Sequence, residues 1–520
     1  MTSIAQLSSH DERETWTAAD KADHNLAAEA LPLAANLIAL VAAFEERAVA
    51  YCYWKSSRRV ERALAGLTDL DLLVAKKDRQ RAVEILHRQA FKCWPDAPRR
   101  DHPALLSFFG YNETDGKINH IHVHFQLVAG HSLIRNFRLP IEERILARSV
   151  PHPTLPIRVL DPTDEALLLI IRANLDMSRS DPVALRHWNE LGQKYADALT
   201  DLAPIVDRAE LTDRARELFS LDLADAIADR LRAMCEGKRP SGLRSAISRE
   251  LSAFRMYGHF EASVRGAWRS ALWVASALNK HSLGAPRLSR RRVFGGALIA
   301  LVGLDGSGKS TLLCEVRRWL IHDVDVVTCY FGTGDGEPSL FFRPFKAISR
   351  LVARAIRTRP MGASHGVVSD KPPGPGYSAL FAVWATAVAI DKWRKLAVAQ
   401  RAVNRGFIVV TDRYPQNEIV GFNDGPLLHR LPRCPAWLKR FEASIYDLAQ
   451  RASPDLVIKL HVGPDTVMRR EPQMIKSIIA QRIAWLDELR FPSARVVSID
   501  ATKPLEEVHR EAKHEIWSVL

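Results

Sequence analysis

The sequence predicts a multi-domain protein with three parts: an α+β module, a helical module, and an α/β module built on a parallel sheet. The chain has 520 residues, and one hydrophobic core rarely grows beyond about 250–300 residues. Apolar residues follow mixed strand and helix periods at first, helical periods from 176 to 278, and a regular strand–helix alternation after 293. Such an alternation is typical of a parallel sheet covered by helices.

The first module is expected at 31–175, after a flexible arm at 1–30. Its predicted elements are a helix at 31–48, a strand at 68–74, a helix at 80–91, a strand at 120–128 and a helix at 161–174. A helical module is expected at 176–278. The basic segment NKHSLGAPRLSRRR at 279–292 contains Gly and Pro, and is the expected linker.

The α/β module is expected at 293–520. Its predicted strands lie at 297–303, 324–331, 407–413, 454–462 and 494–500, with helices between them. The internal segment 358–376 is rich in Pro and Gly, which indicates either a mobile lid or a disordered loop.

Composition is that of an ordinary globular protein, with 47% hydrophobic and 26% charged residues. The net charge of +13 suits polyanionic partners, and it is equally explained by a basic surface that reflects an Arg-rich proteome. Because no helix-turn-helix, zinc or RNA-binding signature accompanies this charge, nucleic acid is not expected as a partner. An NTPase that acts at a nucleic-acid or membrane surface stays open as an alternative.

Cysteine spacing and the apolar runs indicate a cytoplasmic protein. The six cysteines include no C-x-x-C pair, which argues against a zinc ribbon or a disulfide framework. The N-terminal residues lack the pattern of a signal peptide. The longest apolar run, YSALFAVWATAVAI at 377–390, is too short to span a bilayer. No transmembrane segment is therefore predicted, and the run is expected to form a buried helix.

The stretch GLDGSGKST at 303–311 fits the phosphate-loop pattern G-x-x-x-x-G-K-[ST] between an apolar strand and a helix. Glycines let the backbone wrap closely around phosphates, and the helix N-terminus adds partial positive charge. Lys309 is expected to reach the β- and γ-phosphates of ATP, and Ser310 to ligate Mg²⁺. The residues expected to contact the nucleotide are Gly303, Gly306, Ser307, Gly308, Lys309, Ser310 and Thr311. Kinases, ATPases and GTPases share this pattern, although the missing N-K-x-D motif argues against a Ras-type GTPase.

A second candidate feature is FIVVTDRYP, in which an apolar strand delivers Asp412 and Arg413 at its C-terminal end. Open α/β sheets bind their ligands at that edge. Asp412 can hold Mg²⁺ through water, and Arg413 can clamp an acceptor phosphate with two hydrogen bonds.

With GLDGSGKST, the later DRY and the tail PDLVIKLHVGPDTVMRREP, the segment 293–520 resembles the thymidylate kinase family of nucleoside monophosphate kinases. The resemblance implies ATP and Mg²⁺ as cofactors, with Asp305 facing the acceptor and Arg413 binding the acceptor phosphate. It also implies that Arg469 or Arg470 closes over the transferred phosphoryl group and that Thr502 lies near the adenine. Related kinases often pair through helices, and 378–400 is apolar enough to do so, which leaves a homodimer open.

The acceptor side departs from that family. YFGTGDGEP stands where the family has an R-E-P-G loop, and PQNEIVGFNDGP follows DRY where the family holds thymine. GTGDG and NDGP resemble a kinase-like branch encoded among bacterial polysaccharide genes. A nucleoside monophosphate or a related molecule is therefore the expected acceptor, and its identity stays open.

The front module carries its own candidate site in YWKSSRRVERALAGLTDLDLLV. Asp69 and Asp71 lie two positions apart on a predicted strand, so both carboxylates point the same way and can hold Mg²⁺ against a triphosphate. The segment 45–175 resembles the nucleotidyltransferase superfamily, except that Lys55-Ser56 replaces the usual Gly-Ser.

Three histidines, His120, His122 and His124, alternate on another predicted strand. Neighbours on one strand face lie ~6.5–7 Å apart, so a metal site is conceivable for adjacent members, while the outer pair is too distant for one ion. The nucleotidyltransferase likeness places His122 or His124 in the cleft of the two aspartates. Either the front module is a second enzyme fused to the kinase, or it is a non-catalytic module that recruits or regulates it.

Overall fold

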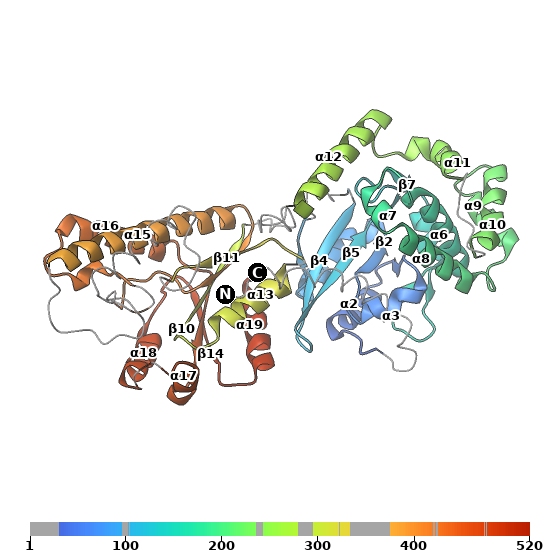
Figure 1. The fold of residues 1–520 in the computed structure, drawn as a ribbon. Helices are drawn as coiled ribbons and strands as arrows, with labels where there is room; N and C mark the ends of the chain where they lie inside the picture. The colour runs from blue at the N-terminus through green and yellow to red at the C-terminus, as the bar shows by residue number, and fades with distance from the viewer. Residues whose placement is uncertain are drawn as a thin grey trace.

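The computed structural model describes residues 31–95, 102, 104–235, 243–278, 295–321, 323–332, 375–419, 422, 425–472, 474 and 476–520. The expected arm at 1–30 and the expected linker at 279–292 lie outside the described residues, as does nearly all of the Pro- and Gly-rich segment 358–376. The described chain forms two sheet-centred bodies that meet near the C-terminal helix (Figure 1).

The front body is built on a mixed seven-stranded sheet with the order β3-β4-β5-β2-β1-β9-β8. β2 runs parallel to β5 and antiparallel to β1. The strands are β1 (Tyr51–Tyr53), β2 (Leu70–Val74), β3 (Lys92–Cys93), β4 (Leu105–Asn112), β5 (Lys117–His124), β8 (Val150–Pro151) and β9 (Arg158–Val159). A separate two-stranded sheet pairs β6 (Leu127–Ala129) with β7 (Phe137–Leu139).

The predicted strand at 120–128 is therefore wrong in one respect. The chain leaves the main sheet after His124, and β6 pairs with β7 in the separate sheet. An alternating pattern reports which side chains share a face, but it does not show that a strand changes partners.

Strand alternation gives the front sheet two different faces. One face packs Leu70, Leu72 and Ile121 into an apolar core with helices α2 (Ala35–Glu46), α3 (Val60–Leu64) and α4 (Arg79–Arg88). The residues between them in the sequence point to the opposite face, toward α6 (Pro162–Asp176). The polar residues of the candidate site lie on that second face.

The helices that follow α6 in the sequence share one apolar core with α6 and with that second face of the sheet. Asp161 caps α6, because its side chain accepts hydrogen bonds from the amides of Thr163 and Asp164. The remaining helices here are α5 (Glu142–Arg148), α7 (Pro182–Arg186), α8 (Trp188–Leu202), α9 (Arg208–Ala215), α10 (Leu221–Cys235), α11 (Leu243–Glu250) and α12 (His259–Leu278).

The second body contains a five-stranded sheet with the order β11-β12-β10-β13-β14, in which every pair is parallel. This confirms the predicted parallel α/β architecture. The strands are β10 (Ala297–Gly303), β11 (Val326–Tyr330), β12 (Ile408–Asp412), β13 (Leu456–His461) and β14 (Arg495–Asp500). The helices are α13 (Lys309–Leu320), α15 (Pro375–Asn404), α16 (Ala436–Arg451), α17 (Pro464–Arg470), α18 (Lys476–Glu488) and α19 (Leu505–Val519).

Helix α15 contains the longest apolar run of the sequence. Its side chains are not all buried, since Val383 is 55% and Trp393 48% exposed. The expectation of a buried helix for 377–390 holds on one side only, because Phe381, Ala385 and Ala389 are buried whereas Val383 is exposed. Among the helices that the structure describes, none is both long and apolar enough to cross a membrane.

The two bodies meet through aromatic side chains. Trp517 on α19 lies against Trp94 and Tyr111 of the front sheet, with ring centroids 5.5 and 6.3 Å apart, and against Trp319 on α13 at 6.4 Å. The Lys92 ammonium donates to the backbone oxygen of Trp517, and the Tyr111 hydroxyl donates to the backbone oxygen of Arg510 at 3.3 Å. The described parts of the two bodies therefore share a buried apolar junction.

Candidate functional sites

The phosphate-loop stretch lies between β10 and α13, at the C-terminal edge of the parallel sheet. β10 is buried along its whole length, which fixes the start of the loop. Gly306 and Gly308 have φ angles of +80° and +94°, where a side chain would strain the backbone. The loop shape therefore depends on glycine at these two positions.

Lys309 is held under the loop at the first turn of α13. Its side chain is buried, and its Nζ donates to the backbone oxygen of Leu304 at 2.6 Å. Burial lowers the pKa of Lys309, while the carboxylates of Asp412 and Asp305 oppose that shift. A buried ammonium held by one loop carbonyl and two nearby carboxylates is placed to exchange that carbonyl for phosphate oxygens.

Ser310 and Asp412 lie together beside the loop. The Ser310 hydroxyl donates to Asp412 Oδ2 at 3.0 Å. The other carboxylate oxygen of Asp412 is buried and has no hydrogen-bond partner among the described residues, and the same holds for the Ser307 hydroxyl. A hydroxyl and a carboxylate with one unsatisfied oxygen form an all-oxygen donor set, which fits Mg²⁺.

Arginines surround Asp305 in the loop. Arg413 Nη2 lies 2.5 Å from Asp305 Oδ1, and Arg482 Nη1 on α18 lies 3.8 Å from Asp305 Oδ2. Arg413 has a φ of +66°, a strained conformation for a non-glycine residue that costs about 1–3 kcal/mol and is typical of functional sites. The structure thus brings Asp305 and Arg413 together.

The two expected lid arginines lie differently. Arg470 Nη1 donates to the backbone oxygen of Gly306 at 2.8 Å, so it already contacts the phosphate loop. Arg469 is exposed, and its Nη2 donates to the Thr466 hydroxyl at 3.3 Å. Of the pair, Arg470 is the residue that the structure places at the loop.

Thr502 follows β14, the edge strand two positions from β10 in the sheet. Its hydroxyl donates to Asp500 Oδ1 at 2.6 Å, and its amide donates to the same oxygen at 2.9 Å. Thr502 therefore lies at the C-terminal edge that also carries the phosphate loop. Among the described residues, Thr502 makes no hydrogen bond to Lys309 or Asp412.

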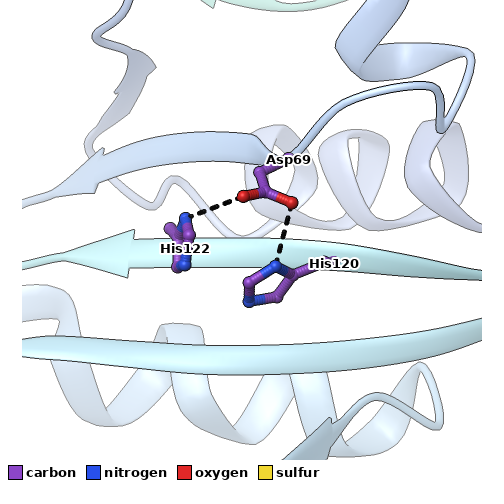
Figure 2. Close-up of side chains that lie close together, drawn as sticks. All are labelled: Asp69, His120 and His122. Carbon is purple, nitrogen blue, oxygen red and sulfur yellow. Dashed lines mark hydrogen bonds and ion pairs between the residues drawn. The ribbon is translucent and has the colours of Figure 1, made fainter. Parts of the chain in front are cut away.

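The front site consists of carboxylates on one strand and histidines on its parallel neighbour (Figure 2). Asp69 Oδ1 lies 2.9 Å from His120 Nδ1, and Asp69 Oδ2 lies 3.6 Å from His122 Nδ1. Burial alone would raise the pKa of Asp69, but the His120 and His122 imidazoles hold it below its usual range. The side chain of Asp69 is still 50% exposed, so this corner of the site opens to solvent.

Asp71 lies deeper on the same face. Its Oδ1 is 3.5 Å from His122 Nδ1, 3.3 Å from His124 Nε2 and 3.8 Å from Lys55 Nζ. Although burial would raise the pKa of Asp71, Lys55 and the two imidazoles hold it well below its usual range. Both aspartates contact His122, as the shared strand face predicts.

Cations line the wall of the front site. Lys55 Nζ lies 4.2 Å from the Trp54 ring centroid, and Arg172 on α6 lies 5.0 Å from the same ring. Burial and the Arg172 charge lower the pKa of Lys55 to about 7, against the opposing effect of Asp71. Two cations held over one aromatic ring beside a carboxylate pair offer binding to an anionic ligand.

Sequence reasoning missed Arg482 and Arg172 as site residues. Both lie on helices with no local motif around them, and each reaches its site only through tertiary packing. A signal for Arg172 exists in hindsight, because it is a cation inside the otherwise apolar run ALLLIIRAN.

Comparison with known proteins finds two similar proteins in Escherichia coli K12. The uncharacterized ATP-binding protein YghS is 29% identical over 229 residues, which cover 43% of this chain and 93% of YghS. The uncharacterized ATP-binding protein YghR is 27% identical over 229 residues, which cover 42% of this chain and 85% of YghR. No protein-family model matches the sequence.

Proposed function

We propose that the second body binds MgATP and transfers its γ-phosphoryl group to a small acceptor, as a thymidylate kinase-like phosphotransferase. The observation that carries this proposal is that the buried Lys309 and Asp412 lie with Ser310 around a loop whose glycines have positive φ. The names of the two E. coli relatives support ATP binding, and the matched length is about that of 293–520.

The residues divide the work between donor and acceptor. Lys309 would stabilise the charge on the β- and γ-phosphates, and Ser310 with Asp412 would hold Mg²⁺, which would neutralise charge developing on the phosphate oxygens. An acceptor oxygen would bond to the γ-phosphorus while the bond to the bridging oxygen breaks. The electron pair of that bond leaves with ADP.

The acceptor is expected beside Arg413. In the present arrangement Asp305 binds this guanidinium, and an acceptor phosphate would compete for the same donors. This geometry favours an anionic acceptor, either a nucleoside monophosphate or a sugar phosphate.

A phosphotransfer screen of the full chain tests the proposal. γ-Labelled ATP with Mg²⁺ would be offered with each nucleoside monophosphate and with sugars and sugar phosphates, and labelled products would be separated. Transfer to at least one acceptor is expected. ATP hydrolysis at an equal rate with and without every acceptor would instead assign the module as an ATPase.

Arg413→Ala is expected to raise the KM for the acceptor found in that screen by roughly 10–150-fold, with little effect on the KM for ATP. A charge-assisted hydrogen bond is worth about 1.5–3 kcal/mol, which converts to that range. Steady-state titration of each substrate separately is the measurement, with the exposed Arg451→Ala as matched control. Equal effects on both KM values would contradict an acceptor role.

For the front body, we propose nucleotide binding by a nucleotidyltransferase-like fold. Lys55 and Arg172 would contact a triphosphate, with the aspartates beside them. Calorimetry of the full chain with MgCTP or MgUTP, in a Lys309→Ala background, separates this binding from the ATP site. An absence of binding would leave the front body as a recruiting or regulatory module.

A further inference from the structure

The donor atoms of Asp69, His120 and His122 converge at the open corner of the front site. One ligand atom from each residue lies within 4.8 Å of the other two. We infer that these three residues bind a divalent transition-metal ion, such as Zn²⁺, Co²⁺ or Mn²⁺, in preference to Mg²⁺. This inference does not rest on phosphoryl transfer by the second body.

The distances suit direct coordination of one ion. Ligand atoms bound tetrahedrally at about 2.0–2.2 Å from a metal lie roughly 3.3–3.6 Å apart. Asp69 Oδ1 lies 2.9 Å from His120 Nδ1 and Asp69 Oδ2 lies 3.6 Å from His122 Nδ1, so each carboxylate oxygen has one imidazole nitrogen near the separation that a shared ion requires. Figure 2 shows Asp69 facing both imidazoles across neighbouring strands, so an ion between them would lie within reach of all three side chains.

The parallel register explains why these three residues meet. Leu70 lies opposite Ile121, and Asp71 lies opposite His122. Asp69, at the start of β2, therefore falls level with His120. The imidazoles of His120 and His122 also lean together, with ring centroids 4.1 Å apart. This ring separation is shorter than the ~6.5–7 Å backbone spacing of alternate strand residues. The two neighbouring histidines can therefore share an ion.

Donor chemistry decides which metal class fits. Mg²⁺ takes oxygen ligands in near-octahedral geometry, and imidazole nitrogen is a poor ligand for it. Two imidazoles and one carboxylate suit Zn²⁺, Co²⁺ and Mn²⁺. The donor set therefore does not fit the two-carboxylate Mg²⁺ site that the nucleotidyltransferase likeness implies.

The surroundings orient the ligands and leave an entry path. The His120 ring stacks on Phe109 at 4.3 Å with a 4° interplanar angle, which fixes the plane of the imidazole. Asp71 Oδ1 lies 3.5 Å from the same His122 Nδ1, so a further carboxylate oxygen stands beside this nitrogen. The half-exposed Asp69 lies on the solvent side.

Lys55 limits the site to a single ion. Its ammonium lies 3.8 Å from Asp71 Oδ1, where a second metal ion would otherwise use that carboxylate. A cation at this position repels a second divalent ion. One metal per front body is therefore the expected stoichiometry.

The test is metal binding to the full chain without nucleotide. Purified protein would be stripped with chelator and titrated with Co²⁺, Zn²⁺, Mn²⁺ and Mg²⁺ by calorimetry, with the Co²⁺ visible spectrum recorded in parallel. One Co²⁺ per chain is expected, with ligand-field bands and no thiolate-to-cobalt charge transfer. The spectrum matters because the six cysteines are alternative ligands, and Cys314 is exposed.

Asp69→Asn and His122→Gln are expected to weaken Co²⁺ binding at least ten-fold. Asp69→Asn is the safer variant for folding because its side chain is half exposed, and circular dichroism checks both. The control is His187→Gln, which removes a histidine 2.9 Å from Glu190 on a helix and should leave binding unchanged. Lys309→Ala should also leave it unchanged, which separates this site from the ATP site.

Three results would overturn the inference. The first is no Co²⁺ or Zn²⁺ binding to the stripped wild type. The second is equal affinity in wild type and Asp69→Asn. The third is displacement of Co²⁺ by Mg²⁺ at equal concentration, which would show that the site is of the Mg²⁺ type that the nucleotidyltransferase likeness implies.

Discussion

Lys309→Ala is expected to reduce phosphoryl transfer by at least ~10²–10³-fold while the protein stays folded. Losses of this size follow the removal of one preorganised charge-stabilising donor from an active site. Lys309 is buried at the first turn of α13 and held by the Leu304 carbonyl under the loop. Its ammonium would lie against the phosphates. The stretch 303–311 contains no second lysine that could replace it.

The measurement is kcat for transfer from ATP, or the ATPase rate if no acceptor is found, together with ATP affinity by calorimetry. Lys117→Ala is the matched control, because Lys117 is an exposed lysine of the front sheet that pairs with Asp115. Turnover within a factor of two of wild type in a folded Lys309→Ala protein would contradict the assignment of the phosphate loop.

Trp517→Ala is expected to destabilise the protein by about 3–5 kcal/mol, because truncating a buried Trp removes apolar burial and leaves a cavity. Trp517 is 7% exposed and lies among Trp94, Tyr111 and Trp319. The loss should lower the melting temperature of the affected transition by roughly 6–20 °C.

Differential scanning calorimetry is the suitable measurement, since a protein with two bodies need not unfold in one step. Trp437→Ala serves as control because that side chain, on α16, is 68% exposed, and its loss should change stability by less than about 0.5 kcal/mol. An equal, small shift in both variants would show that the junction contributes little to stability.

The parts of the fold that depend on local sequence were predictable. GLDGSGKST carries its strand, glycine turn and helix start within a few residues, so the loop around Lys309 follows from pattern alone. The strands of the parallel sheet are short apolar runs separated by helices, and all five occur near the predicted positions. Strand parity placed Asp69 and Asp71 on one face, and the nucleotidyltransferase likeness placed His122 or His124 in the same cleft; both aspartates lie near His122.

The features that escaped prediction depend on contacts between distant residues. Arg482 and Asp305 are far apart in the sequence, and only the packing of α18 brings them together. The transfer of the chain from β5 to β6 depends on β7, which follows later. The choice between Mg²⁺ and a softer metal at Asp69 depends on register, because a slip by one residue would turn the histidines away.

The aromatic junction has a consequence for the newly made chain. Lys92 and Trp517 are 425 positions apart, and Tyr111 and Arg510 are 399 apart. At about 5–20 residues per second, the ribosome needs roughly 20–80 s to add the intervening chain. During that interval the front sheet has Trp94, Tyr111 and its two-residue edge strand β3 without α19 beside them. Exposed aromatic side chains beside a sheet edge promote association between chains, so this interval is when nascent chains most need a chaperone.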